Sequence, residues 1–457
     1  MKSIIKLLII SLLFSGCSKK EFLNEKPKDS LIIPTTLAHF QALLDRDAYL
    51  NGTNGQGVTP QLGESGADNF YLLDADFNAN LRPQMQNYYT WDAQPYAGVE
   101  VLDWLYPYRA ILATNTVLSH LDKIGASKDD LNYLKAQALF HRAHLFYQLA
   151  QVFAPPYRSG GANDEKSIPL RMTDDINEVL VKSTVAETYS RIVGDLKESV
   201  KYLKENNDFP TRPSKQAGYA LLSRVSLMMQ DYTAAEKYAD SCLAITDFLL
   251  DYNLINMALT EPLTGNNQSG IIKPEVIYWA GMLADPYQYY PTTFLSALIP
   301  DQLYNSYTEG DLRKKLFFEK RPNGYRFRGT YNYFSTRSNY FSGLAVDEIF
   351  LNRAECRVRN GKVAGGLLDL NHLLEKRWEK GKYVPVENLS QADALKLILE
   401  ERRKELIFRG IRWSDLRRLN IEGANITLER TVDGRKYVLS PNDPRWTWPF
   451  PLEVTAK

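Results

Sequence analysis

Residues 395–420 read LKLILEERRKELIFRGIRWSDLRRLN, and this stretch determines how the C-terminal part of the chain folds. Apolar residues and arginines recur at three- and four-residue steps as far as Arg409, which predicts a helix. Gly410 permits a bend, and a second helix is expected to begin near Trp413. The stretch therefore predicts two consecutive helices.

Basic and acidic residues are dense on both predicted helices and can join them through bidentate carboxylate pairs. They are Arg402, Arg403, Glu405, Arg409, Arg412, Asp415, Arg417 and Arg418. An arginine-built catalytic or phosphate site is one interpretation, but no glycine-rich phosphate loop accompanies these residues. We favour a structural clasp that locks the end of the chain.

Helical hairpins precede this stretch. The arms of two of them span 216–229 with 232–243, and 345–359 with 363–377, and residues 100–152 could form a third. Small residues such as Ala235 and Ala239 let two helices approach closely, and their spacing resembles the tetratricopeptide (TPR) pattern. The hairpins follow no fixed period, so generic antiparallel helices are the alternative to the TPR-like pairs that we predict.

Single helices are also expected from the hydrophobic period. They cover Trp104 to Leu121, about 129–152 and about 184–203. Thr184 and Glu187 have the spacing of a capping box, in which each residue bonds the backbone of the other at a helix N-terminus.

Two regions lack a helical period. Residues 51–98 are rich in Gly, Asn and Asp and are expected to form a long ordered loop region. Residues 250–343 are interrupted by Pro and Gly, their aromatic residues cluster, and the alternation within 320–340 suggests short strands. The expected fold class is mainly α, with TPR-like helix pairs forming a scaffold and a loop-rich, partly β insertion carrying the ligand surface.

The first 17 residues have the layout of a lipoprotein signal. Two lysines open it, an apolar run continues to Phe14, and Ser15-Gly16-Cys17 closes it. The run is shorter than the roughly 20 apolar residues that a membrane-spanning helix needs. Cleavage before Cys17 and acylation of its thiol would tether the chain to a membrane. An ordinary cleaved signal followed by a chance cysteine is the alternative.

The domain organisation follows from these regions. We expect a signal peptide at 1–16, a lipid-anchored tether at 17–34, an N-terminal helical, TPR-like region at 35–249 that includes the loop at 51–98, the loop-rich insertion at 250–343 and a C-terminal helical region at 344–457. The mature chain is longer than a typical single core supports, so one large domain or two closely packed domains are expected.

Composition limits the function classes. The formal net charge is +1 at pH 7, so the chain lacks the basic footprint of a nucleic-acid-binding protein. Tyrosine is abundant, with 28 residues, and suits sugar-binding surfaces as well as helical cores. Cys242 and Cys356 fall within helical patterns and are expected to be small buried hydrophobic residues, although a disulfide between them stays open.

Several short motifs follow one another along the chain. They are Cys17 with Phe22-Leu23, Trp104-x3-Tyr108-x2-Ile111-x3-Asn115, Phe140-x-Arg142-Ala143 leading to Ile168-Pro169-Leu170, Tyr232-x2-Ala235-x2-Tyr238-Ala239, Glu348-x2-Leu351-x2-Ala354-Glu355 with Asn371 and Arg377, Glu401-Arg402-x2-Glu405-Leu406-x-Phe408-x-Gly410-x-Arg412-x2-Asp415-Leu416, and the closing Trp448-Pro-Phe-Pro-Leu-Glu453. In this order they resemble the SusD/RagB family of nutrient-uptake lipoproteins, and the resemblance covers nearly the whole chain.

The resemblance implies a binding protein rather than an enzyme. Such proteins lie at the cell surface, lipid-anchored to the outer membrane, and cover a partner SusC-like TonB-dependent transporter. They bind a glycan or oligosaccharide, or in some branches a peptide, and deliver it to that partner. The fold that the resemblance implies, a helical scaffold with TPR-like pairs supporting irregular loops, agrees with the helical periods described above.

Aromatic residues in the irregular regions are the candidate ligand-binding residues. A sugar presents an apolar face that stacks on Tyr or Trp rings, while polar side chains bond its hydroxyls. The candidates are Tyr71, Trp91, Trp279, Tyr287, Tyr289, Tyr331 and Tyr333, and each could instead be a packing residue.

The main alternatives are a secreted, lipid-anchored glycoside hydrolase, which needs two carboxylates, and a TPR-like protein-docking scaffold without a small ligand. Asp68, Asp74 and Asp76 could serve catalysis or bind calcium, but they lack the spacing and glycine of a calcium loop. His141 and His144 share a helix face without HExxH spacing, so helix packing is their expected role. No cofactor is expected.

Overall fold

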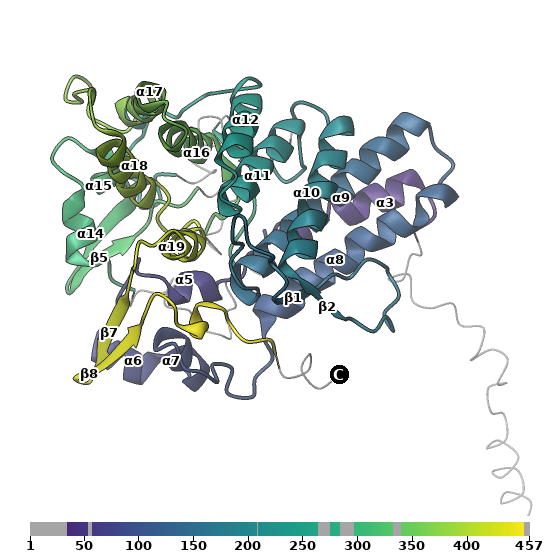
Figure 1. Cartoon of the computed structure of the whole chain (residues 1–457), viewed down its shortest axis with the longest axis horizontal. Helices are drawn as coiled ribbons and strands as arrows, with labels where there is room; N and C mark the ends of the chain where they lie inside the picture. The colour runs from purple at the N-terminus through teal and green to yellow at the C-terminus, as the bar shows by residue number, and fades with distance from the viewer. Residues whose placement is uncertain are drawn as a thin grey trace, which may run out of the picture.

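The computed structural model describes residues 34–53, 57–207, 209–263, 275–283, 297–331 and 340–451. In this part of the chain the molecule is mainly helical, as predicted, and side-by-side helices make up most of it (Figure 1). Helices α8 to α10 lie at one end of the view, α14 to α18 lie at the other, and α5 to α7 lie below with β7 and β8. None of the described helices is both long and apolar enough to cross a membrane.

The longer helices pack as consecutive neighbours. They are α8 (Leu102–His120), α9 (Lys128–Phe153), α10 (Val185–Tyr202), α11 (Lys215–Met228), α12 (Tyr232–Leu243), α16 (Val346–Arg359), α17 (Val363–Glu375), α18 (Gln391–Glu405) and α19 (Arg412–Ile421). α8 packs on α9, α9 on α10, α11 on α12 and α16 on α17. α12 also packs on α16, which joins the hairpins that are distant in sequence. The predicted helix pairs are thus confirmed.

Small residues at the pair interfaces explain the close approach of the helices. Ala235 and Ala239 of α12 are fully buried. A Cβ atom on Gly366 of α17 would lie 2.7 Å from the carbonyl oxygen of Ala354 in α16 and 2.5 Å from the side chain of Val358. A larger residue at Gly366 would therefore push α16 and α17 apart.

The capping box at the start of α10 is also confirmed. The hydroxyl oxygen of Thr184 accepts a hydrogen bond from the backbone N–H of Glu187 at 3.1 Å, and the Glu187 carboxylate accepts one from the Thr184 N–H at 2.8 Å. These two bonds satisfy backbone donors that a helix N-terminus otherwise leaves without partners.

Short elements fill the regions between the helix pairs. The short helices are α3 (Leu37–Leu44), α4 (Asp47–Leu50), α5 (Leu62–Gly66), α6 (Asp74–Asn80), α7 (Pro83–Tyr89), α14 (Asp301–Ser306) and α15 (Leu312–Phe317), with 3-10 turns η1 (Leu121–Lys123), η2 (Tyr252–Leu254) and η3 (Pro444–Trp446). The described strands form antiparallel pairs: β1 (Lys166–Pro169) with β2 (Lys182–Thr184), β3 (Val276–Tyr278) with β6 (Leu344–Ala345), β4 (Phe318–Arg321) with β5 (Gly324–Phe327), and β7 (Leu428–Val432) with β8 (Arg435–Leu439).

One expectation about the fold needs correction. The region 51–98 is not a long loop, because α5, α6 and α7 lie within it. α7 begins with Pro83, whose fixed backbone angle suits a first helical position, and α6 carries Asp74 and Asp76 in its first turn, where the helix dipole favours acids. Helices of five to seven residues are too short to produce a hydrophobic period.

The buried apolar residues form two clusters. The larger cluster contains the interiors of the helix pairs from both the N-terminal and the C-terminal parts of the chain. The smaller one gathers residues of the 250–343 region with Phe70, Phe77 and Tyr89 from around α6 and α7, and with Phe408. The predicted division of the chain at 249/250 and 343/344 stays a prediction, although most residues of the smaller cluster come from that region.

The predicted clasp between α18 and α19 is confirmed only in part, through Arg402 and Asp415. Most of the other residues predicted for it bind elsewhere: Glu405 pairs with Arg377, Arg409 with Asp347, Arg403 and Arg412 with Asp68, and Arg417 binds main-chain oxygens at the end of α9. Arg402 of α18 donates to the Asp415 carboxylate of α19 at 2.8 Å. Arg418 donates to Asp415 at 3.0 Å and forms a bidentate pair with Glu355 of α16 at 2.6 and 2.8 Å. All four side chains are buried, and the positive φ of Gly410, 70°, allows the bend between the two helices. The clasp therefore also fastens the end of the chain to a helix pair.

The cysteines and histidines singled out in the sequence are interior residues. Cys242 and Cys356 are both buried and both free, so no disulfide joins them. Burial lowers the pKa of His141 and His144 to about 3, which keeps both rings neutral. His141 pairs through Nδ1 with the Tyr278 hydroxyl at 3.1 Å, and Nε2 of His144 lies 3.1 Å from the Gln148 amide. The two histidines therefore lie on α9 in the packed interior, as predicted.

Candidate functional site

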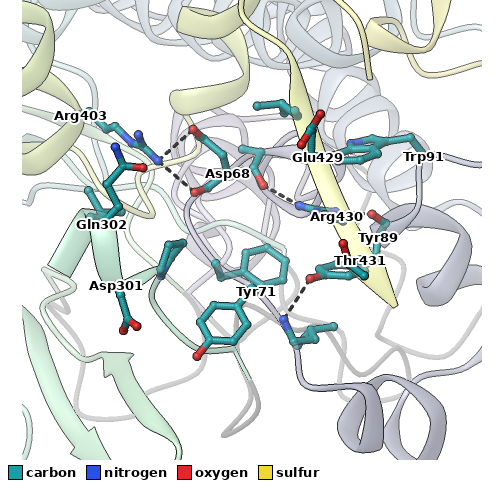
Figure 2. Close-up of a pocket in the computed structure, with 16 residues that line it drawn as sticks. Asp68, Tyr71, Tyr89, Trp91, Asp301, Gln302, Arg403, Glu429, Arg430 and Thr431 are labelled. Carbon is teal, nitrogen blue, oxygen red and sulfur yellow. Dashed lines mark hydrogen bonds and ion pairs between the residues drawn. The ribbon is translucent and has the colours of Figure 1, made fainter. Parts of the chain in front are cut away.

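A pocket of about 480 Å³ opens where the two apolar clusters meet (Figure 2). Its lining comes from five places in the chain: residues 67–72 after α5, the end of α7 with Trp91, residues 300–303 at the start of α14, Arg403 of α18 and residues 428–431 of β7. Phe70, Leu72 and Leu303 give it an apolar floor, and all three are buried. The pocket therefore exists only in the folded chain.

Arg430 of β7 holds the wall behind the pocket. Its guanidinium donates to the main-chain oxygens of Ser65 at 2.9 Å, Ala67 at 2.6 Å and Tyr89. It also lies 4.0 Å from the centre of the Tyr89 ring and 4.5 Å from that of Trp91, a cation–π arrangement. Burial lowers the pKa of Arg430 to about 10, so the group stays charged at neutral pH.

Asp68 is fixed by two arginines. Arg412 of α19 forms a bidentate pair with its carboxylate at 2.7 and 3.0 Å, and Nη2 of Arg403 lies 2.9 Å from Oδ2. Burial alone would raise the pKa of Asp68, but Arg412 and Arg403 outweigh it and hold that pKa well below its usual range. Asp68 is therefore an anchored anion in the wall and cannot act as a general acid.

Tyr71 is the half-buried aromatic residue of the pocket. Its backbone exchanges hydrogen bonds with Leu298, at 2.8 Å through its N–H and 3.0 Å through its oxygen. Burial, helped by the nearby carboxylate of Asp301, raises the pKa of its hydroxyl, so the phenol stays neutral and can donate. In Figure 2 its ring lies between Asp301 on one side and Thr431 on the other.

The remaining polar lining is exposed. Asp301, Gln302, Glu429 and Thr431 are solvent-exposed side chains from α14 and β7 that line the pocket. An aromatic ring beside several exposed hydrogen-bonding groups is the combination that fits a sugar, which has an apolar face and a polar edge.

The structure brings two of the predicted ligand residues together. Tyr71 and Trp91 both line the pocket. The Trp91 ring is only 2% exposed, packs on Arg430, and donates through Nε1 to the oxygen of Gly66 at 3.0 Å. Trp91 is thus part of the wall, whereas Tyr71 presents accessible surface.

Two other candidates lie in the interior. Trp279 is buried and donates through Nε1 to the oxygen of Tyr331 at 3.1 Å. Tyr331 is buried as well, and its hydroxyl donates to Glu275 at 3.1 Å. A sugar ring cannot stack on either residue in this conformation, because protein atoms already occupy their faces. Tyr287, Tyr289, Tyr333 and Cys17 lie outside the described residues.

Sequence reasoning did not select Arg430, Asp301, Gln302, Glu429 or Thr431 for this site. One signal was present in the sequence: within LERTV at 428–432, an arginine stands between two apolar residues at the inward positions of an alternating strand. A charged residue at an inward position needs buried partners, which indicates a special environment.

A second cluster of charged residues lies deep in the molecule. Among the described residues, Glu275, Asp347 and Glu405 form the group of carboxylates close enough together to hold a metal ion. Arg377 already pairs with Glu275 at 2.5 Å and with Glu405 at 2.6 Å, and Arg409 pairs with Asp347 at 2.5 Å. Arginines therefore supply the positive charge that a cation would bring, and the cluster is structural.

The hypothetical calcium cluster does not assemble in the described structure. Asp68 is held by Arg412 and Arg403, while Asp74 and Asp76 lie on α6 in its first turn. These three acids do not converge on a common point among the described residues that could bind a metal.

Comparison with known proteins places the chain in a family. A family model described as "Starch-binding associating with outer membrane" (SusD-like) matches residues 21–227, and the SusD family model (SusD/RagB) matches residues 325–447. SusD-like protein P2 of Formosa agariphila is 23% identical over 91% of this chain and 90% of its own length.

Solved structures share the fold. A SusD superfamily protein from Bacteroides thetaiotaomicron is 19% identical, with a TM-score of 0.73 over 92% of this chain and 98% of that protein. A SusD-like carbohydrate-binding protein from Bacteroides vulgatus is 19% identical, with a TM-score of 0.66 over 93% of this chain and 96% of that protein. These structures share the fold, and the two SusD family models, which match residues 21–227 and 325–447, show that the chain belongs to the SusD/RagB family.

Proposed function

We propose that this protein is a lipid-anchored protein of the outer-membrane surface that binds a nutrient glycan or oligosaccharide and delivers it to a SusC-like TonB-dependent transporter. The observation that carries the binding part is the pocket beside Tyr71, with its accessible ring and its exposed polar rim. The starch-binding description of the matching family model and the carbohydrate-binding description of a protein with the same fold support a glycan as the ligand.

The proposed binding geometry uses the pocket residues in two ways. The Tyr71 ring stacks on the apolar face of a sugar, and its hydroxyl donates a hydrogen bond. Asp301, Gln302, Glu429 and Thr431 bond the sugar hydroxyls from the rim. Tyr287, Tyr289 and Tyr333 stay predictions for further contacts, and Cys17 stays the predicted site of the lipid anchor.

The pocket favours binding over catalysis. A glycosidase needs one carboxylic acid that is protonated when the reaction begins. Asp68, the half-buried carboxylate in the wall of the pocket, cannot fill that role, since two arginines keep it ionised. We therefore propose that the protein is not an enzyme and needs no cofactor.

The test is a ligand screen with the chain from Ser18 to Lys457, which lacks the predicted signal and lipid-bearing cysteine. Polysaccharides and peptides are embedded in native gels, and the retardation of the protein is measured, while reducing ends or new amines report turnover. We expect retardation by at least one polysaccharide without product formation. Turnover that persists after repurification would favour a hydrolase, and retardation by peptides alone would replace the glycan as the ligand. Failure of all ligands would favour a docking scaffold.

A further inference from the structure

The connection between β1 and β2 carries apolar side chains that the folded chain leaves exposed. Ile176, Val179 and Val181 are 76%, 75% and 75% exposed. Leu180, which lies between the two valines, is partly buried against the larger apolar cluster, as are Leu170 and Met172 at the start of the connection. The segment is thus fastened at Leu180 while its two outward neighbours are valines.

This arrangement reverses the usual pattern of an extended surface segment. When one side of such a segment faces the core, the outward positions normally carry polar residues. Apolar residues at those positions, close together on a projecting connection, indicate a surface that another apolar phase covers.

Of the three acidic residues in the connection, Asp174 and Glu178 contact other side chains of the protein, whereas Asp175 is exposed and accepts a hydrogen bond from the Asn177 N–H at 2.8 Å. The Asp174 carboxylate lies 3.5 Å from Nδ1 of His120 at the end of α8. The Glu178 carboxylate lies 3.8 Å from the Arg171 guanidinium and accepts from the Thr173 hydroxyl at 2.8 Å. These contacts hold the Asp174 and Glu178 carboxylates against polar side chains of the protein.

The place of the connection relative to the N-terminal segment indicates what covers its apolar side chains. His120, which contacts Asp174, also stacks on Phe40 of α3, with ring centres 5.8 Å apart. α3 is the first described helix, so the connection lies beside the end of the molecule that receives the N-terminal segment (Figure 1). A chain extends by at most about 3.5 Å per residue, so residues 18–33 reach at most about 56 Å, which limits how far this end can lie from a lipid anchor at Cys17.

We propose that Ile176, Val179 and Val181 insert into the outer surface of the lipid bilayer and orient the anchored protein on it. Interfacial segments of this kind bury apolar side chains by about 5–10 Å at the headgroup boundary. Anchoring raises the local concentration of the patch at the membrane, so a small patch that would bind weakly from solution is occupied. The inference rests on the proposed anchoring at the N-terminus.

The test compares two valines of equal exposure. Val384, in the connection between α17 and α18 at the opposite end of the molecule, is 78% exposed and serves as the control for Val179. Val179→Cys and Val384→Cys are labelled with an environment-sensitive nitrobenzoxadiazole dye. Cys242 and Cys356 do not compete for the label, because both are buried and burial raises the pKa of both thiols.

The labelled chains, from Ser18 to Lys457, carry a hexahistidine tag before Ser18 and are tethered to phosphatidylethanolamine–phosphatidylcholine vesicles that contain a nickel-chelating lipid. We expect the dye at position 179 to become brighter, to shift to shorter wavelength and to be quenched by spin-labelled lipids, while the dye at 384 stays in water. Equal responses at both positions, or none at 179, would overturn the proposal. A response at 179 only with protein-containing outer-membrane fragments would also overturn it and would assign the patch to a protein partner.

A second variant separates lipid insertion by the native side chains from insertion by the dye. Ile176→Thr, Val179→Thr and Val181→Thr together keep the β-branched shapes but add hydroxyls, and Val384→Thr is the matched control. We expect the triple variant to reduce the vesicle partition coefficient of untethered protein, measured with lipid in large excess so that the weak binding of wild type is detected, roughly tenfold or more, given the transfer free energy of three apolar side chains. A partition coefficient equal to that of wild type would overturn the proposal. Because the tether is artificial and no glycan is present, failure here leaves the proposed acylation and ligand binding to their own tests.

Discussion

The arginines of the clasp and the arginine behind the pocket are all buried, but their charges are balanced in different ways. Arg402 and Arg418 face the carboxylates of Asp415 and Glu355, and these arginines hold the pKa of both acids below its usual range despite burial. Arg430 faces three main-chain oxygens and aromatic rings, and its own pKa falls to about 10. Charge pairs thus lock the clasp, whereas Arg430 holds its part of the pocket wall through main-chain hydrogen bonds.

The difference has a functional consequence. Arg430 binds the backbone of Ser65, Ala67 and Tyr89, and the Tyr71 side chain takes no part in these contacts. Tyr71 can then vary with the ligand without loss of the fold. In the clasp, by contrast, each of the side chains is itself part of the structural contact.

The largest expected effect is at the clasp. Arg418→Met leaves Glu355 and Asp415 buried with fewer positive partners, and the loss of one partner of a buried ion pair costs about 3–5 kcal/mol. The free energy of unfolding in urea measures it. Lys201→Met, which removes the exposed ion pair with Glu198, should change that free energy far less. Equal losses in the two variants would contradict the structural role of the clasp.

The next largest expected effect is a dependence of stability on pH, which arises beside the pocket wall and not at the clasp. Glu64 of α5, beside the pocket wall, accepts bonds from Asn69 at 2.6 Å and from the Gly410 N–H at 3.2 Å, and burial raises its pKa to about 7. The folded chain therefore binds more protons than the unfolded chain between about pH 4.5 and pH 7, so stability falls as pH rises through this interval.

Glu64→Gln removes this titration. We expect wild type to lose about 3 kcal/mol of unfolding free energy relative to Glu64→Gln between pH 4.5 and pH 7.5. Urea unfolding at a series of pH values gives the difference, in which the other titrating groups cancel. A difference that does not vary with pH would show that Glu64 is ionised in the folded protein throughout.

Loss of Arg430 should destabilise mainly the segments that form the pocket wall. Arg430→Met leaves buried carbonyl groups of Ser65, Ala67 and Tyr89 without their donor and should cost about 2–3 kcal/mol. Hydrogen exchange should then rise in α5 and α7 while the α18–α19 hairpin stays protected, and Arg418→Met should give the opposite pattern. Equal exchange in both regions for both variants would remove the distinction between clasp and wall.

Sequence reasoning reached the clasp and the helix pairs because their signals are local. Arg402, Asp415 and Arg418 stand within one short motif, Thr184 and Glu187 are three residues apart, and Ala235 and Ala239 repeat at helical spacing. In each case residue types at close spacing in the sequence predict the contact, whereas Glu355, the partner of Arg418 on α16, lies outside the motif and was not predicted.

The pocket could not be predicted in the same way, because its lining comes from segments up to 364 residues apart in the chain, from Ala67 to Thr431. The acceptors of Arg430 are main-chain oxygens, which no residue type marks. Trp279 and Tyr331 look like Tyr71 in sequence, since an aromatic residue in an irregular region carries no sign of whether its ring packs inside or faces solvent.

The central claim, that the pocket beside Tyr71 binds a glycan, is tested most directly by calorimetric titration of the first polysaccharide or oligosaccharide found in the screen. Tyr71→Ala is compared with Tyr202→Ala, a tyrosine exposed on α10 away from the pocket. We predict that Tyr71→Ala weakens binding at least roughly tenfold, as expected for loss of a stacking ring and one hydrogen bond, while Tyr202→Ala binds like wild type. Equal affinity of the two variants would contradict the account.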